Sequence, residues 1–231
     1  MNKKLVLFID DNDITEIIGK LQRRLQKEGI TLIPSFLNLK EERFKKENPE
    51  NKDETVLDFN SIKEELKQEY MNERYDVIAC DFNFLDKNLN GFKLTKWLKN
   101  EAKAQKNRIR NAKFTLYSSE KEKSVRDTFG EDDMGSLIRL KMEDFFDRAY
   151  LADGLATLIH NNENEVDLTL KLLQELDKYP DLKFKSAYAK FEGKSLKEIS
   201  DEIENETHHG IKFQETLIEL CVAHMINLNE E

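Results

Sequence analysis

The sequence predicts a doubly wound α/β domain with a five-stranded parallel sheet, followed by a small module made only of helices. Two observations lead to this fold class. Short apolar runs and helical patterns alternate five times within the first 160 residues, and no convincing strand follows them. Continuous apolar runs are typical of parallel strands buried on both faces, and their alternation with helices implies right-handed crossovers.

The composition indicates a folded, water-soluble chain. Of the 231 residues, 39% are hydrophobic and 36% charged, and only 3 are Pro and 8 Gly, which argues against a low-complexity chain or a turn-rich β-sandwich. The net charge of −9 provides no overall positive field for nucleic acid or an anionic membrane. The first apolar run is too short for a signal peptide, and Cys80 and Cys221 suit a reducing compartment, so we expect a cytoplasmic protein without a membrane anchor.

The chain begins with its clearest strand and helix. An apolar run over 5–9 predicts a central strand. Apolar residues at i, i+3, i+4, i+7 and i+11 then mark one face of a helix over 14–25, which Gly29 ends. A second strand is expected over 30–36, at an edge of the sheet or with an irregular end, because Pro34 lacks the N–H that a central ladder needs.

The next segment, 38–60, is dense in charge and has no apolar period, so we expect an exposed insertion. A helix should begin with Ser61 as its N-cap, since Glu64 stands at the capping-box position, and continue to Tyr75. The remaining elements of the sheet domain are expected in this order: a strand over 77–80, a helix after Gly91, a strand over 114–117, charge-mixed helical sequence up to Leu140, a short strand over 145–146 and a helix over 151–159.

The domain boundaries are expected at a hinge over 161–164, which divides a sheet domain, 1–160, from an acidic helical module, 161–231. The module holds 8 Lys and Arg against 16 Asp and Glu, a net charge of −8. Its helices are expected over 168–176, after Ser195, where Glu198 completes a capping box, and over 213–228. Only two lysines follow Ser195, so DNA binding is not expected. The last helix is apolar beyond one stripe, which predicts deep burial or an interface in an oligomer or with a partner.

Polar residues stand at the ends of four predicted strands: Asp10 and Asp11, Asp81, Ser118 and Ser119, and Asp147 with Arg148. In open α/β sheets, ligands bind beyond the carboxyl ends of the strands. Three carboxylates that converge there repel one another, and they suit Mg²⁺ as oxygen ligands. A carboxylate beside such a cation can attack an activated phosphate, while a hydroxyl and a cationic side chain hold the transferred oxygens.

These residues resemble the receiver domains of two-component response regulators. Residues 7–12, Leu-Phe-Ile-Asp-Asp-Asn, are similar to the first strand of that family with its acidic pair, and residues 75–81 to its third strand. Gly91-Phe92 matches the start of the third helix, and Ser118 stands at the Ser/Thr position of the fourth strand. The resemblance covers about residues 3–160.

The resemblance implies a flavodoxin/CheY-like fold and a phosphorylation site. Asp81 would be the phosphoacceptor, with Ser118 and Arg148 beside it and Phe145 as the aromatic switch residue. Mg²⁺ would be held by four groups: Asp10, Asp11, Asp81 and the backbone carbonyl of Asn83. The implied partners are a sensor histidine kinase or another protein, and a second copy of the chain. No enzymatic activity is implied beyond self-phosphoryl transfer and autodephosphorylation, and the output would be protein–protein contact through the helical module.

The chain departs from that family in several places. The proline expected after Asp81 is absent, with Leu85 near its place. Arg148 replaces a lysine, and although it keeps the positive charge, it is bulkier and planar. Lys141 would be the counterpart if the fifth strand were 137–140, but the spacing of the following helix favours Arg148.

Simpler explanations also exist for single residues. Asp10 and Asp11 suit the start of a helix, and Arg148 suits a surface ion pair with Asp144 or Asp147.

Two other functions stay open. Arg148 is compatible with a scaffold that works without phosphorylation. The string Asp11-x-Asp13-x-Thr15 resembles phosphohydrolases of the haloacid dehalogenase superfamily. Three observations oppose the phosphohydrolase. The first apolar strand ends at Asp10, one residue too early for the Asp11-x-Asp13-x-Thr15 string, and Asp132-Asp133, the candidate for that family's late acidic pair, does not follow an apolar strand. The haloacid dehalogenase superfamily also gives no special place to Asp81.

Overall fold

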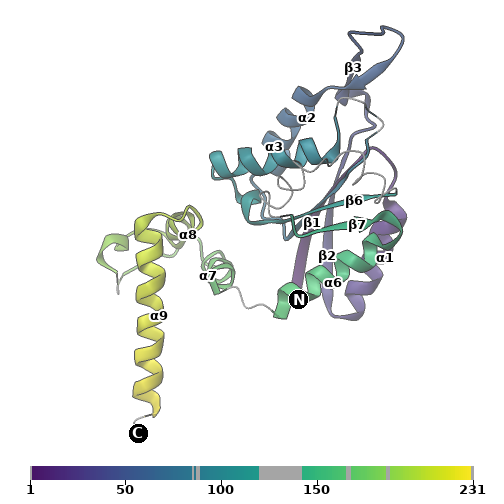
Figure 1. The fold of residues 1–231 in the computed structure, drawn as a ribbon. Helices are drawn as coiled ribbons and strands as arrows, with labels where there is room; N and C mark the ends of the chain where they lie inside the picture. Colours follow the sequence, from purple (N-terminus) through teal and green to yellow (C-terminus); the bar gives the residue numbers. More distant parts are fainter. Residues whose placement is uncertain are drawn as a thin grey trace, which may run out of the picture. The chain divides into compact units, whose positions relative to one another are not determined.

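The computed structural model describes residues 2–84, 86, 89–119, 142–164, 168–185 and 188–229, without the side chains of 161–164 and 170. The chain divides into two compact units, Met1–Glu163 and Asn164–Glu231 (Figure 1). Several expectations from the sequence lie outside the described residues: the helical sequence up to Leu140, Asp132 and Asp133, Leu85, and Lys141 with its alternative strand.

The first unit is built on a five-stranded parallel sheet, as predicted. Its strands are β1 (Asn2–Asp10), β2 (Ile30–Asn38), β5 (Val77–Asp81), β6 (Lys113–Ser118) and β7 (Asp144–Asp147). They lie in the order β2-β1-β5-β6-β7, which is the flavodoxin-like order with its reversal between β1 and β5. Pro34 lies in the edge strand β2, where a missing N–H costs little, so this prediction is confirmed.

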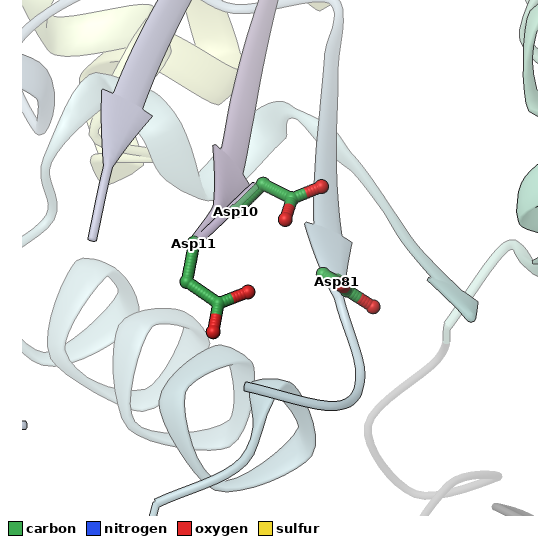
Figure 2. Close-up of side chains that lie close together, drawn as sticks. All are labelled: Asp10, Asp11 and Asp81. Atoms are coloured by element: carbon green, nitrogen blue, oxygen red, sulfur yellow. The ribbon is translucent and has the colours of Figure 1, made fainter. Parts of the chain in front are cut away.

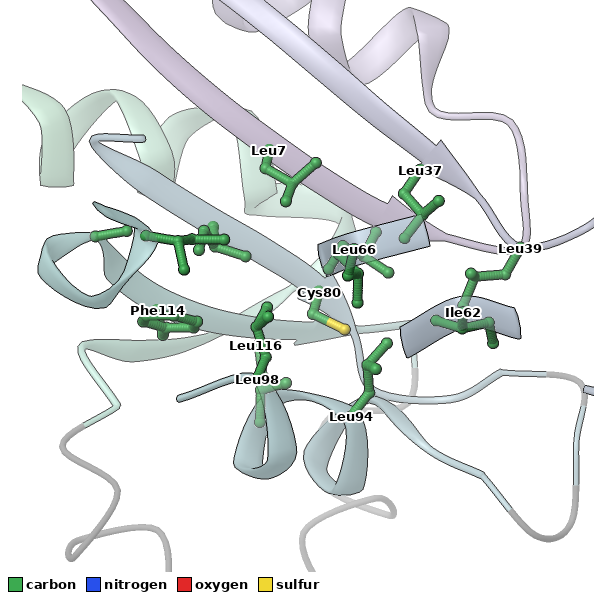
Figure 3. Close-up of a cluster of buried hydrophobic side chains, with 14 of the residues drawn as sticks. Leu7, Leu37, Leu39, Ile62, Leu66, Cys80, Leu94, Leu98, Phe114 and Leu116 are labelled. Carbon is green, nitrogen blue, oxygen red and sulfur yellow. The ribbon is translucent and has the colours of Figure 1, made fainter. Parts of the chain in front are cut away.

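Helices cover both faces of this sheet. On one face, α1 (Thr15–Lys27) and α6 (Leu151–Asn164) pack against a core that includes Phe8, Val77 and Tyr117. On the other face lie α2 (Phe59–Glu65), its π-helical continuation η2 (Leu66–Tyr70) and α3 (Gly91–Ala104). Figure 3 shows this second core, where leucines and isoleucines of the helices meet those of the strands. The two cores lie on opposite faces of the sheet, so the strand ends are held from both sides.

The insertion over 38–60 is not exposed throughout, and this prediction is wrong at its base. A 3₁₀ turn, η1 (Glu42–Phe44), leads into a hairpin of β3 (Lys45–Glu47) and β4 (Thr55–Leu57). Leu39 and Phe44 are fully buried in the core beneath α2. Two isolated apolar residues therefore anchor a segment whose overall composition resembles a solvated loop.

The start of α2 also differs from the prediction. Its N-cap is Asp58, whose carboxylate accepts a hydrogen bond from Asn60 N at 3.3 Å and from the Ser61 hydroxyl at 2.8 Å. Ser61 is therefore a donor within the first turn, because Asp58 is the stronger acceptor. The helical backbone also ends at Tyr70, five residues earlier than expected.

The two units divide between Glu163 and Asn164, within the segment 161–164 where a hinge was expected, but the helix does not break there. Helix α6 continues through Asn164 without interruption. The segment Asn161-Asn162-Glu163-Asn164 contains neither Gly nor Pro, so nothing in it breaks a helix that is already under way.

The second unit consists of α7 (Leu168–Leu176), α8 (Leu196–Glu204) and α9 (His208–Asn229), with a 3₁₀ turn, η5 (Ala189–Phe191), before α8. Its core joins the three helices through Leu173, Phe191, Ile199, Ile203 and Phe213. Ser195 and Glu198 form the predicted capping box at the start of α8. Among the residues that the structure describes, no helix is both long and apolar enough to span a bilayer.

Candidate functional site

Three carboxylates meet at the carboxyl edge of the sheet. Asp10 ends β1, Asp11 follows it, and Asp81 ends the neighbouring strand β5, whose register pairs Ile9 with Cys80. One oxygen of each carboxylate lies within 4.8 Å of the others, and Figure 2 shows the three side chains at the adjacent strand ends. All three are buried, with exposed fractions of 0%, 6% and 4% for Asp10, Asp11 and Asp81. None of them caps α1, whose N-cap is Ile14, and the burial of three carboxylates requires compensation by cations.

Arg148 enters this cluster from the end of β7. Its Nη1 lies 2.9 Å from Asp10 Oδ2 and 3.1 Å from Asp81 Oδ2, and its side chain is 20% exposed. Asp147 instead caps the turn that follows β7, since its carboxylate accepts a hydrogen bond from Ala149 N at 2.8 Å. Arg148 is therefore a cation of the pocket, bridging two buried acids, and not part of a surface ion pair.

Tyr117 completes the contacts of Asp10, and sequence reasoning missed it. Its hydroxyl donates a hydrogen bond of 2.6 Å to Asp10 Oδ2, and the Arg148 guanidinium carbon lies 5.6 Å from the centre of its ring. Burial, followed by the Asp10 carboxylate, raises the pKa of Tyr117 well above its ordinary value, so the phenol stays a donor. A signal existed in the sequence: a tyrosine in a buried strand, directly before Ser118, needs a partner for its hydroxyl.

Ser118 reaches Asp81 through Asn83. The Ser118 hydroxyl, fully buried at the end of β6, accepts a hydrogen bond from Asn83 Nδ2 at 3.1 Å. Asn83 N in turn donates to Asp81 Oδ1 at 3.3 Å, which places this residue beside the carboxylates. A role for the Asn83 carbonyl as a metal ligand stays a prediction.

Phe145 packs on the α3 side of the sheet. Its ring stacks on that of Phe82, the residue after Asp81, with centroids 5.4 Å apart and planes inclined by 28°. The ring is half-buried, and it lies against the core beneath α2 and α3. The proposed switch residue is therefore in direct contact with the strand end that carries Asp81.

The electrostatics of the pocket centre on Asp81. Burial, and next the Asp10 carboxylate, raise its pKa to about 7, although the Asn83 N–H and Arg148 act in the opposite direction. The guanidinium therefore offsets only part of the repulsion. Further positive charge would favour the ionised carboxylate, and the oxygen-only donor set fits a hard cation such as Mg²⁺. Asp10, Asp11 and Asp81 are the residues that would hold it.

A pH dependence of stability follows from this pKa. In the unfolded chain the pKa of Asp81 is near 4, whereas in the folded protein it is about 7. Without metal, the protonated side chain therefore contributes stability that is fully present below about pH 4 and is lost as the pH rises through about 7. We expect the free energy of unfolding, measured by urea titration in a chelator, to fall by about 3 kcal/mol more for the native protein than for Asp81→Asn between pH 5 and 8. Added Mg²⁺ should remove this difference, and parallel pH profiles in the chelator would contradict it.

The insertion borders Asp11, which the sequence did not predict. A cavity of about 180 Å³ is lined by Asp11, Lys40, Lys45 and residues of β4. Asp86 ties the hairpin to the loop after β5, because its carboxylate accepts hydrogen bonds from Leu57 N at 2.6 Å and Leu89 N at 2.9 Å. The insertion is therefore one wall of the acidic site.

No family model and no curated protein matches the sequence. Solved structures that resemble the chain are response regulators. A response regulator from Thermotoga maritima is 13% identical, with 69% of this chain and 96% of that chain covered and a TM-score of 0.36. A signal receiver domain from Colwellia psychrerythraea 34H is 13% identical (68% and 98% covered, TM-score 0.35), and an orphan response regulator of H. pylori 12% (68% and 94%, TM-score 0.36). The fold assignment rests on the strand order itself: the chain has the flavodoxin-like sheet with a buried cluster of three aspartates at its carboxyl edge.

Proposed function

We propose that this protein is a response-regulator-like signalling protein in which Asp81 accepts a phosphoryl group. The convergence of Asp10, Asp11 and Asp81 within 4.8 Å, with Arg148 on Asp81, carries this proposal. Mg²⁺ held by these carboxylates and the Asn83 carbonyl would supply the remaining positive charge. A sensor histidine kinase is the phosphodonor that the resemblance implies, and free thiols at Cys80 and Cys221 favour a cytoplasmic location.

In the proposed reaction, an Asp81 carboxylate oxygen attacks the phosphorus of the donor, and the bond from phosphorus to the leaving group breaks. The leaving group departs with the bonding electrons, and Asp81 becomes an acyl phosphate that water later hydrolyses. Arg148 already lies 3.1 Å from Asp81 Oδ2, so its guanidinium is placed to bind the incoming oxygens. A cavity of about 340 Å³ adjoins Arg148 and is also lined by Lys20, Ser119 and Asp147.

Signal output in this proposal is protein–protein contact through the helical module. Between Ser195 and the end of the chain, the cations are Lys197 and Lys212, too few to neutralise a DNA backbone. Ser118 and Phe145 would transmit a change in the phosphorylation of Asp81 to the last strand and the last helix of the sheet domain.

The test is the intact mass of the full chain after incubation with Mg²⁺ and acetyl phosphate. We expect one phosphoryl adduct, a gain of about 80 Da, on the native protein and none on Asp81→Ala. Asp13→Ala is a matched control that should keep the adduct, because Asp13 is exposed and accepts hydrogen bonds from Thr15 at the start of α1. An adduct that persists in Asp81→Ala would assign the acceptor to another residue.

A second function, that of an adaptor independent of phosphorylation, is favoured by one observation. Arg148 contacts Asp10 and Asp81 at once, so a built-in cation already occupies part of the space of an incoming phosphoryl group. The absence of an adduct in a sample that binds Mg²⁺, measured by calorimetry, would favour this function.

A phosphohydrolase of the haloacid dehalogenase type is disfavoured by the position of Asp13. Its carboxylate is engaged with Thr15 at the surface, whereas the buried cluster joins Asp10, Asp11 and Asp81. Turnover of a generic phosphate ester would reverse this preference.

A further inference from the structure

The second half of α9 carries an exposed apolar face. Within the described residues, the module core reaches this helix through Phe213 and Leu217. Beyond them, α9 extends past α8 (Figure 1). The apolar face consists of Ile218, Cys221, Val222, Met225, Ile226 and Leu228. Its members are exposed, with exposed fractions of 45% to 65% for the five large hydrophobic side chains among them.

The spacing of these residues is that of a single packing surface. Ile218, Cys221, Val222 and Met225 follow the i, i+3, i+4, i+7 pattern of a helix face that is buried against another element. Leu220 is also 45% exposed, but at 100° per residue it lies about 160° around the helix from Ile218. Six apolar side chains share this face, whereas the opposite side carries Leu220 and the small Ala223, and such a concentration marks an interaction surface.

We infer that this face binds the same face of a second copy of the chain, as an isologous dimer. The face carries no Asp, Glu, Lys or Arg between Leu220 and Asn229, so its central part can meet a second copy without like-charge repulsion although the module is acidic. Toward the module, Glu219 lies about 100° around the helix from Ile218, at the border of the face, and Glu215 pairs with Lys212 at 2.7 Å. An uncharged face is complementary to itself, whereas a charged partner would lose hydration against it.

A lipid bilayer fits this face less well than a second copy. The apolar segment, Ile218–Leu228, is about 16 Å long, half of a hydrocarbon core. It belongs to a module with a charge of −8, which anionic lipids repel. A helix pair of this length lies at the low end of specific interfaces, below about 1,200 Å² in total, so the dimer should be reversible.

The experiment is sedimentation of the full chain from about 1 to 500 µM, the range in which small interfaces dissociate. The native chain should pass from monomer to dimer. Ile218→Glu with Met225→Glu should weaken the dimer at least ~100-fold, because charges would face each other across the two-fold axis. Both native side chains are 56% exposed, so the variant should keep its helical circular dichroism. Leu220→Glu, on the opposite side, should change dimerisation by less than about threefold.

A second measurement needs no substitution. Cys221 is exposed on the apolar face and Cys80 is buried, so a thiol reagent reports on Cys221 in the native chain. Its labelling rate should fall as the dimer forms. A chain that stays monomeric throughout, labelling that does not change with concentration, or equal loss of the dimer in Leu220→Glu would overturn the inference. None of these results depends on phosphorylation of Asp81.

Discussion

Replacing Gly91 by alanine is expected to lower the free energy of unfolding by at least about 3 kcal/mol and to abolish the phosphoryl adduct on Asp81. A Cβ at this position would lie 1.8 Å from the Asp81 carbonyl oxygen and 2.7 Å from its carbonyl carbon. Gly91 N also donates a hydrogen bond of 2.9 Å to Phe82 O, so the helix start and the strand end are locked together. Alanine must push apart the backbone that carries Asp81, the proposed acceptor, and urea unfolding with intact-mass analysis would show both effects.

Gly19→Ala is the matched control for this substitution. A Cβ at Gly19 meets only the end of the Arg23 side chain, at 3.5 Å, in the interior of α1. Alanine there should stabilise the protein by about 0.5–1 kcal/mol through its higher helix propensity. Equal effects of the two substitutions would refute the close approach of α3 to Asp81.

Replacing Arg148 by alanine is the second change with a large expected effect. In a chelator at pH 8, the free energy of unfolding should fall by about 3 kcal/mol, because Asp10 and Asp81 would lose the guanidinium that bridges them. The loss should shrink at pH 5, where Asp81, with its raised pKa, is protonated. Since the guanidinium competes with metal for the same carboxylates, the affinity for Mg²⁺ should rise at least ~10-fold.

Calorimetry with Mg²⁺ and urea unfolding at both pH values would test these effects. Lys20→Ala removes an exposed ion pair, 3.0 Å from Glu16, and should change stability by less than about 0.5 kcal/mol. If Arg148→Ala behaved like this control at pH 8, the guanidinium would not be a counter-ion of the buried acids.

Much of the fold and the centre of the site were predictable from the sequence. The runs over 5–9 and 77–80 predict neighbouring buried strands, and both observed strands end in aspartate, at Asp10 and Asp81. Carboxyl ends of parallel strands share one edge of the sheet, so the meeting of these acids follows from topology alone. Arg148 was identified by its spacing to the following helix, and the structure brings it to the pocket.

Other features depend on contacts between distant parts of the chain. Tyr117 lies opposite Asp81 in the ladder, but its hydroxyl reaches Asp10 on the strand beyond, and no local pattern encodes that reach. Similarly, the burial of Leu39 and Phe44 requires α2 above them. Asp58 and Ser61 are both suitable N-cap residues for α2. Asp58 is the observed N-cap because its carboxylate is the stronger hydrogen-bond acceptor.

The pocket joins two layers that are otherwise separate. Arg148 contacts Asp10 and through it Tyr117, which belongs to the core beneath α1 and α6. It also contacts Asp81, whose neighbours Asn83 and Phe82 lead to Ser118 and Phe145 on the α3 side. The Arg148 side chain therefore connects the two sides of the sheet domain. Loss of the Arg148 contacts would therefore affect the packing on both faces of the sheet at once.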